Sequence, residues 1–294
     1  MRILMYVLIL ALLVSCIEKK SVSSDSKIFL AAKPLVELTD KKLNEVSGLA
    51  ASANNPGLLW THNDSGNKPE VYLVDEKLKI KLTCKIQGVK NRDWEDIAVG
   101  PGPEEGKNYL YVADIGDNNA NYSFKYIYRF EEPVLANQSG EITIAEFDTI
   151  VFRLEDGKKD TEAIMIHPET KDLYVVSKRE KPVYLYKLKY PYSVHDTLTA
   201  TKVISLPLTQ IVAAGISTDG NEILMKNYDN VYYWNIKDKS IKDALQAKPQ
   251  ILKYTEEPQG EAITFARDGS GFYTLSEKLK GKRIYLYFYE RQTP

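Results

Sequence analysis

The chain carries a repeated pattern of strand-like segments, and this repeat constrains the fold more than any other feature. Residues 162–180 align without a gap on residues 261–279, and the same frame fits residues 47–65 and 212–230. A further copy begins at Glu95 and needs a longer loop before its second strand. Self-similar units of this kind are typical of repeat architectures, in which each unit buries its hydrophobic face against the next.

Each copy continues with an aromatic, strand-like segment. These segments centre on Tyr72, Tyr128, Tyr184, Tyr232 and Tyr285. Four copies then add a more polar strand, at residues 78–86, 149–154, 202–206 and 251–254. The last copy has no such strand, but residues 28–38 have the right character to supply it. Pairing them with the last copy would close a ring and leave no open sheet edge.

The pattern therefore predicts an all-β chain, folded as a five-bladed β-propeller that the N-terminal strand 28–38 closes on the C-terminal blade. A six-bladed propeller is the alternative, because the long stretch between Glu95 and Glu162 has room for another unit. Twenty tyrosines, with many valines and isoleucines, favour strands over helices. Residues 28–294 are predicted to form one domain, since their number suits a single large core.

The N-terminus predicts export and lipidation. Arg2 precedes an apolar run, residues 3–14, that is too short for a permanent membrane span, and Ser15 and Cys16 end it. We expect residues 1–15 to be a lipoprotein signal peptide and Cys16 to be acylated, with 16–27 as a flexible tether; an ordinary buried segment is the alternative. By resemblance to known sorting patterns, Ile17 after the cysteine favours the outer membrane of a Gram-negative cell envelope.

The composition excludes several classes of site. Once Cys16 is lipidated, Cys84 has no partner for a disulfide, and it is interpreted as a small buried hydrophobe. The three histidines, His62, His167 and His195, are too scattered for a zinc cluster. A formal net charge of −1 and the lack of a basic stripe argue against nucleic acid as a partner.

One position of the repeat predicts a metal site. It is occupied by Ser47, Glu95, Glu162, Val212 and Glu261 in the successive copies. Equivalent positions on the inner strands of a propeller face one another, so three carboxylates and a hydroxyl would converge, and like charges packed together repel. A cation with oxygen ligands resolves this, and calcium tolerates irregular geometry best. The alternative is that the glutamates accept hydrogen bonds from neighbouring backbone N–H groups.

A second set of polar residues follows the ends of the second strands and predicts the mouth of the site. It comprises His62, Asn63, Asp64, Asp114, Asp117, Asn118, Ser177, Lys178, Asn227, Tyr228, Ser276 and Glu277, with Arg179 and Lys226 beside them. The mixture of charges suits an anionic group bound over a cation, whereas solvated turns are the alternative. For His62 alone, a structural hydrogen bond is favoured over catalysis. The densest acidic stretch near the predicted ring is Asp93-Trp94-Glu95-Asp96.

Several motifs resemble a family of uncharacterised exported bacterial propellers that carries an esterase-like or phytase-like label. The motifs are Glu45-Val-Ser-Gly-Leu-Ala, Trp60-Thr-His-Asn-Asp-Ser-Gly, Asp93-Trp-Glu-Asp-Ile-Ala, Tyr111-Val-Ala-Asp-Ile-Gly-Asp-Asn and Pro258-Gln-Gly-Glu-Ala. A second resemblance is to calcium-dependent apyrases, five-bladed propellers that hydrolyse nucleoside di- and triphosphates. It implies that Ser47, Glu95, Glu162 and Glu261 surround one calcium, and Val212 departs from that pattern.

Three functional hypotheses follow. The first is a calcium-dependent hydrolase of phosphate esters or nucleotides, with Glu95, Glu162, His62 and Lys178 as catalytic candidates and Lys226 offsetting negative charge. The second is a non-catalytic lipoprotein with structural calcium that binds a protein or glycan, and the third is a metal-dependent esterase or lactonase. The sequence has no Gly-x-Ser-x-Gly motif, which disfavours a serine hydrolase of that type. The expected partners are the membrane, through Cys16, and a small anionic substrate.

Overall fold

The computed structural model describes residues 28–137 and 140–292, and within them the chain is all-β, as the sequence predicted. The described residues form 21 strands, one short α-helix, α1 (Ile241–Leu245), and one 3-10 helix, η1 (Leu135–Asn137). None of the described helices has the length and apolar character needed to cross a membrane. The predicted signal peptide, Cys16 and tether lie outside the described residues.

Most strands belong to antiparallel units of four that follow one another along the chain. The first unit contains β2 (Val46–Ala51), β3 (Leu59–Asn63), β4 (Glu70–Val74) and β5 (Ile80–Ile86). The second contains β6 (Trp94–Pro101), β7 (Asn108–Asp114), β8 (Lys125–Glu131) and β10 (Asp148–Leu154). The third contains β11 (Thr161–Ile166), β12 (Leu173–Ser177), β13 (Val183–Leu188) and β14 (Leu198–Leu206). The fourth contains β15 (Ala213–Ile216), β16 (Glu222–Lys226), β17 (Val231–Asn235) and β18 (Gln250–Leu252).

The last unit joins the two ends of the described chain. It contains β19 (Gly260–Phe265), β20 (Gly271–Ser276) and β21 (Tyr285–Glu290), with β1 (Lys33–Glu37) as its outer strand. The antiparallel pairing of β1 with β21 is the one predicted for residues 28–38. An isolated bridge between Phe29 and Arg291 extends this pairing. The two ends of the described chain are therefore tied together by backbone hydrogen bonds.

Two short parallel pairings depart from this plan. β10 pairs with β14, which merges the second and third units into one eight-stranded sheet. β9 (Gly140–Ile144) pairs with β5 as a fifth strand on the first unit. The stretch of chain between β8 and β10 therefore adds η1 and a single outer strand.

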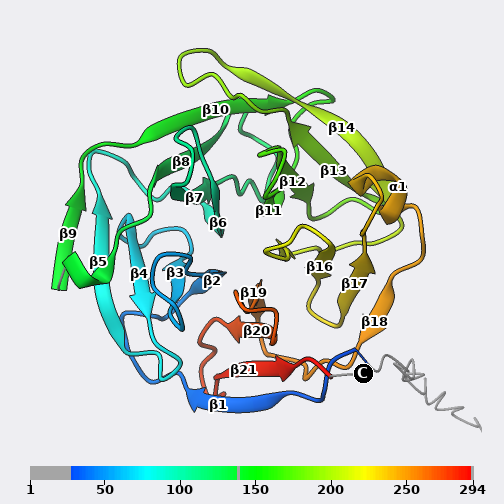
Figure 1. Cartoon of the computed structure of the whole chain (residues 1–294). Helices are drawn as coiled ribbons and strands as arrows, with labels where there is room; N and C mark the ends of the chain where they lie inside the picture. The colour runs from blue at the N-terminus through cyan, green and yellow to red at the C-terminus, as the bar shows by residue number, and fades with distance from the viewer. Residues whose placement is uncertain (1–27, 138–139, 293–294) are drawn as a thin grey trace, which may run out of the picture.

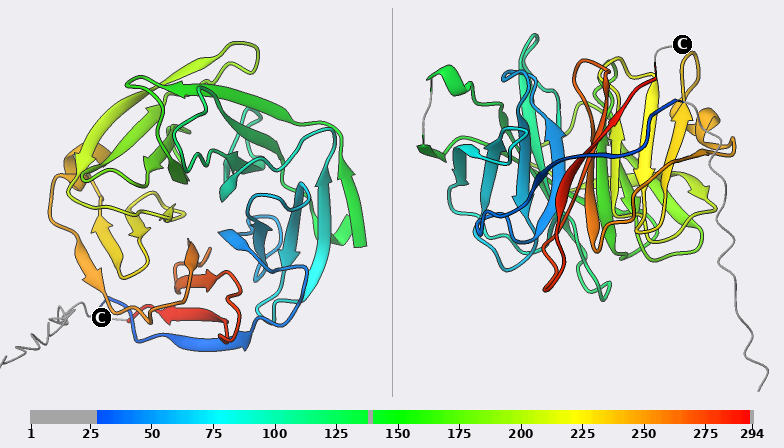
Figure 2. Two further views of the ribbon diagram at one scale, coloured as in Figure 1. Left: turned by 180° about the vertical axis from the view of Figure 1, so that it is seen from behind. Right: turned by 90° about the horizontal axis from the view of Figure 1, so that it is seen from below.

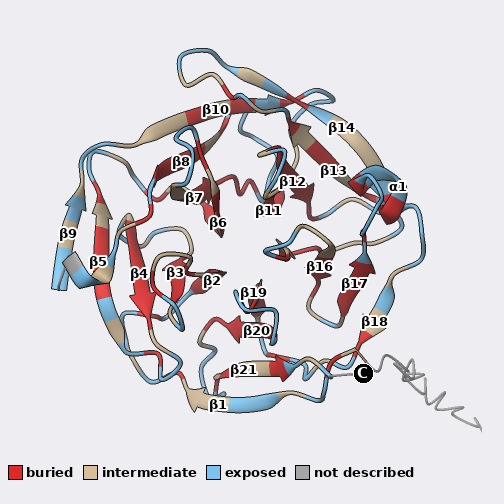
Figure 3. Ribbon diagram, viewed as in Figure 1, coloured by how far each residue is buried: buried red, intermediate tan, exposed pale blue. Residues whose placement is uncertain are grey.

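The units stand around a common centre, with their first strands innermost (Figures 1 and 2). Each inner strand contacts the next around the ring, in the order β2, β6, β11, β15, β19 and back to β2. The buried clusters lie between neighbouring units; Trp60 and Leu73 of the first unit, for example, pack with Trp94 and Leu110 of the second. Figure 3 shows the same gradient, from buried inner strands to more exposed outer ones.

A buried carboxylate reinforces the junction between the first two units. Glu132 follows β8 and accepts hydrogen bonds from Ser52 Oγ, from Trp60 Nε1 at 2.8 Å and from the Asn54 backbone N–H at 2.9 Å. Because buried polar groups are costly unless they are paired, this fully bonded carboxylate holds the β2–β3 turn against the second unit.

Candidate functional site

Four inner strands begin with a β-bulge, and each bulge falls on a residue of the predicted metal set. The pairing of β2 with β3 skips Ser47, and that of β6 with β7 skips Glu95. The pairing of β11 with β12 skips Glu162, and that of β19 with β20 skips Glu261. A bulge bends its strand and redirects a side chain, and bulges are frequent beside active sites.

The fourth unit lacks this feature. β15 pairs with β16 in uninterrupted register, and Val212 stands just before the strand, with its N–H bonded to the Lys226 carbonyl. Val212, which has no side-chain ligand atom, is therefore also the residue of the set at which the described backbone has no bulge. The local backbone and the side-chain chemistry vary together across the five inner strands.

The four bulge residues are all buried and stand at the start of their inner strands. Ser47 contacts Glu95, Glu95 interacts with Glu162, and Glu162 and Glu261 share Lys178. Ser47 Oγ donates a hydrogen bond to the Glu95 carbonyl oxygen at 3.0 Å and lies 3.5 Å from Glu95 Oε2. Lys178 Nζ lies 3.0 Å from Glu162 Oε2 and 3.9 Å from Glu261 Oε1. Lys178 is thus a buried counter-ion between two of the glutamates. We call the bulge residues and Lys178, together with the neighbouring Asp64, Asp93 and Glu277, the acidic end.

Within the acidic end, the carboxylates that converge most closely are those of Asp64, Asp93 and Glu95. One oxygen of each lies within 4.8 Å of the others, a spacing that could hold a metal ion. Glu95 was predicted as a ligand and Asp64 as a mouth residue, whereas Asp93 was in neither set. The acidic stretch 93–96 was the feature of the sequence that could have indicated Asp93. The sequence does not show, however, that this stretch folds toward Asp64.

The acidic end holds more carboxyl groups than cations. The pKa values of several of these carboxyl groups are raised, mainly because the groups are buried. Burial raises the pKa of Glu162 to about 8, although the Lys178 ammonium acts in the opposite direction. Burial and the neighbouring Glu261 raise the pKa of Glu277 to about 9. Burial also raises the pKa of Asp64 to about 6 and that of Glu95 well above its ordinary value. Desolvation disfavours the charged form of each group.

Two carboxylate oxygens at the acidic end have no hydrogen-bond partner among the described residues. They are Glu162 Oε1 and Glu277 Oε1, and both side chains are buried. The Glu162 carboxyl group lies against that of Glu95, and the Glu277 carboxyl group against that of Glu261, so the groups nearest to these oxygens are other acids. The second oxygen of Glu162 is taken by Lys178. Buried polar atoms are nearly always paired, so an acceptor without a donor inside an acidic cluster indicates a place for a cation, a proton or a water.

His62 and Asn63 have structural roles in this arrangement. His62 is completely buried against Trp94, its Nδ1 lies 3.1 Å from the Asn63 carbonyl oxygen, and burial lowers its pKa to about 4. The Asn63 amide accepts a hydrogen bond from the Glu45 backbone N–H and donates one to the Lys42 carbonyl. The two residues therefore hold the turn that presents Asp64.

Other predicted mouth residues are spread over different environments. Asp114 is buried beside Arg92, whose Nε lies 3.4 Å from its Oδ1, and it accepts a hydrogen bond from the Asp93 backbone. Lys226 is fully buried and donates to the Gly260 carbonyl, and burial lowers its pKa to about 8. In this arrangement Lys226 is not open to a substrate that arrives from solvent.

Two further residues support the acidic end: Tyr228, which the sequence placed among the mouth residues, and Asp96, which it named only as part of an acidic stretch. The Tyr228 hydroxyl donates a hydrogen bond to Glu261 Oε1, which orients that carboxylate. Asp96, next to Glu95, is completely buried and accepts hydrogen bonds at 2.8 Å from the backbone N–H groups of Ile97 and Ile164. Asp96 thereby ties β6 to β11 on the inner face of the ring.

Comparison with known proteins adds no relative from which a role could be transferred. No protein-family model matches the chain, and no curated protein matches it. The chemistry of the acidic end therefore has to be argued from its own residues.

Proposed function

We propose that the chain is a five-bladed β-propeller that binds a divalent cation at the acidic end. The ring of contacts among five inner strands supports five blades, with β1 completing the last one. The six-bladed alternative needs a further unit between β8 and β11, but the described chain there supplies only η1, β9 and β10. β9 lies outside β5 rather than on the axis, which favours five.

The cation site rests on three independent observations. Four bulges fall on Ser47, Glu95, Glu162 and Glu261, and contacts link these residues, those between Glu162 and Glu261 running through Lys178. Asp64 and Asp93 join Glu95 within 4.8 Å. The buried Glu162 Oε1 has no nitrogen or hydroxyl donor among the described groups and faces the carboxyl group of Glu95, and this atom carries the proposal. We therefore revise the predicted ligand set: Asp64, Asp93 and Glu95 bind the cation, with Glu162 beside them.

Calcium fits these residues best. All the available ligand atoms are oxygens, and they come from loops and bulges rather than from a regular frame, which suits the flexible coordination of Ca²⁺. Magnesium demands a near-ideal octahedron and keeps several of its waters. The abundance of buried carboxylates also favours a divalent ion, because Lys178 alone does not neutralise them.

We propose that this centre hydrolyses a phosphate ester or nucleotide. Calcium, when bound, would polarise a phosphoryl oxygen. Glu162 is placed beside the trio to accept a proton from an attacking water, and its raised pKa suits that role near neutral pH. Lys178, on the other side of Glu162, would offset negative charge that develops on the substrate.

The test combines stability with turnover. The purified protein is stripped with chelator and melted with calcium or with magnesium, and phosphate release is then measured from a phosphomonoester and a nucleoside triphosphate. We expect calcium to raise Tm, and Glu162→Gln to lower kcat at least about a hundredfold, the usual scale for a proton-transferring group. Glu222→Gln is the control, because Glu222 pairs with Arg291 away from the acidic end. No calcium effect on Tm would overturn the cation centre.

A binding protein with structural calcium is the second candidate, and a specific observation favours it. The cations nearest to the acidic end are already paired: Lys178 with Glu162, Arg179 with Asp160 and Arg92 with Asp114. A phosphate would have to displace one of these contacts. Stabilisation by calcium without turnover of any phosphate ester, acyl ester or lactone would select this candidate over the hydrolase.

We also propose that the protein is an outer-membrane lipoprotein held by acylated Cys16. The support is the pattern of residues 1–16. Cys16→Ser should move the full chain from the membrane fraction to the soluble fraction of a producing cell. Retention of this variant in the membrane fraction would refute anchoring through Cys16.

A further inference from the structure

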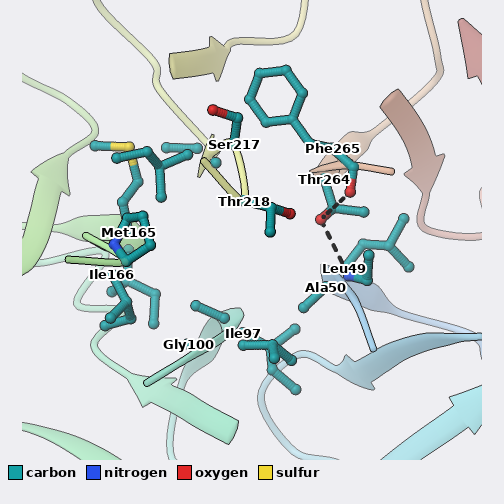
Figure 4. A pocket seen from close by; sticks show the side chains of 18 of the residues that line it. Leu49, Ala50, Ile97, Gly100, Met165, Ile166, Ser217, Thr218, Thr264 and Phe265 are labelled. Carbon is teal, nitrogen blue, oxygen red and sulfur yellow. Dashed lines mark hydrogen bonds between the residues drawn. The ribbon is translucent and has the colours of Figure 1, made fainter. Parts of the chain in front are cut away.

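The opposite end of the central axis is a pocket that the proposed function does not use; most of its lining side chains are apolar, but polar atoms make up as much of its accessible wall as apolar ones. The acidic residues occupy the first positions of the inner strands, whereas later positions of the same strands line this pocket, so the two sites lie at opposite ends of the ring. Its apolar wall includes Leu49, Ile97, Ile166, Ile263 and Phe265. Figure 4 shows the side chains around an open centre.

Small residues keep the pocket open. Ala50, Ala98 and Ala214 belong to its wall, and a side chain added at Gly215 would meet nothing closer than the Thr264 Cα at 4.0 Å. The pocket is partly open to solvent and has a volume of about 80 Å³. An apolar cavity of about 150 Å³ accommodates benzene, so this space suits roughly three or four aliphatic carbons.

A cation without a partner stands at the rim. Arg267 lines both the pocket and the adjoining polar cleft, and its guanidinium makes no hydrogen bond or ion pair with residues 28–137 or 140–292. Arg267 is exposed, so its side chain can reach solvent above the pocket. Partial burial lowers its pKa, whereas the Glu132 carboxylate acts in the opposite direction. The neighbouring Arg291 differs, because both of its terminal nitrogens bond Glu222.

Glu132 attracts Arg267 electrostatically but forms no hydrogen bond or ion pair with it, and the other nearby polar groups are engaged elsewhere. Ser217 Oγ donates to Asp219, and Thr218 Oγ1 donates to the Arg267 carbonyl oxygen. Asp268 accepts a hydrogen bond from the Ser270 backbone. The rim therefore combines satisfied hydroxyls and carboxylates with one free guanidinium, next to an apolar space that ends inside the ring.

We infer that this end of the axis binds a short aliphatic monocarboxylate, with its hydrocarbon part between Leu49, Ile97 and Phe265 and its carboxylate on Arg267. Guanidinium is the side chain best suited to bind a carboxylate through two parallel hydrogen bonds. The small volume selects a chain of about four to six carbons in all, because only three or four fit below the rim. Neither the cation nor any residue of the acidic end takes part in this binding.

The probe is isovalerate, and its binding to the full chain is measured by calorimetry and by ligand-observed NMR. We expect saturable binding that is the same in chelator and in excess calcium, so failure of the cation centre would not affect the result. Arg267→Gln should weaken it roughly tenfold to a hundredfold, the scale of a lost hydrogen bond to a charged group. Lys237→Gln, another cation of the adjoining polar cleft, should leave it unchanged.

A second variant tests the hydrocarbon end independently. Gly215→Val places methyl groups in the open centre, and it should abolish isovalerate binding while Tm stays within a few degrees of the wild type. The neutral isostere isovaleramide should bind the wild type more weakly than isovalerate does. The Arg267→Gln variant should bind the amide and the acid with equal affinity. The inference is overturned if isovalerate does not bind saturably, if both variants bind it as the wild type does, or if the amide binds as tightly as the acid.

Discussion

Gly116 lies directly against the proposed cation site, and its replacement by alanine tests whether that site is built as we describe. An added Cβ would stand 2.0 Å from Glu95 Oε1 and 2.5 Å from the Asp93 carboxylate. Real Cβ atoms do not come within 3.0 Å of such neighbours, so Glu95 Oε1 must move by at least 3.0 − 2.0 = 1.0 Å. Gly116 has no positive φ that alanine would strain.

The displacement should affect cation binding more than folding. The atoms that must move are the ends of side chains, so we expect a stability cost of about 1–3 kcal/mol, as for other overpacked sites. Calcium ligands, by contrast, must lie at about 2.3–2.6 Å from the ion. A shift of 1.0 Å in one oxygen should therefore raise the Kd for calcium at least about tenfold, or about 1.4 kcal/mol.

Thermal melts in chelator and in calcium separate the two effects. With calcium at about one hundred times the wild-type Kd, the wild type should gain about 2.7 kcal/mol, and a variant with tenfold weaker binding about 1.4 kcal/mol. Gly215→Ala is the control, since its new methyl meets open space. If Gly116→Ala keeps the full calcium gain, Asp93 and Glu95 are not the ligands and the proposed geometry is refuted.

Two further predictions concern stability. With calcium removed, the free energy of unfolding should fall as pH rises from about 5 to about 9, because folding raises the pKa of Glu162 to about 8 and that of Glu277 to about 9. The folded chain then holds protons that the unfolded chain has released; denaturant titrations at several pH values check this, and a flat or rising curve contradicts it. Glu132→Gln should cost about 1–3 kcal/mol, since its amide would face the Trp60 and Asn54 donors, and should leave calcium affinity unchanged in calorimetry.

Much of the strand pattern could be predicted because the repeat is carried by side chains with clear preferences. The segment predicted at residues 149–154 corresponds to β10, Asp148–Leu154, and the spare strand at 28–38 contains β1. β9 was not predicted. Its sequence, Gly-Glu-Ile-Thr-Ile, is short and half polar, and it is placed by pairing with β5, a partner distant in the chain.

The candidate site was predicted in outline only. Alignment of the repeats brought Ser47, Glu95, Glu162 and Glu261 to one equivalent position, and the structure brings them to one end of the axis. The alignment did not indicate Asp93, which reaches the site because the loop before β6 folds toward Asp64. That approach depends on loop conformation, which leaves no periodic signal in the sequence.

The sequence by itself determined the all-β character of the chain and which residues of the repeat are equivalent, because strand preference and spacing are local properties. Only the tertiary structure decided which equivalent residues meet and in what state. The burial that raises the pKa of Glu162 and the contact between Lys178 and two glutamates both come from neighbours far away in the chain. The position of Arg267 beside the pocket at the far end of the axis likewise depends on strands that are distant in the chain. Desolvation and charge proximity depend on three-dimensional distance, which the order of residues does not contain.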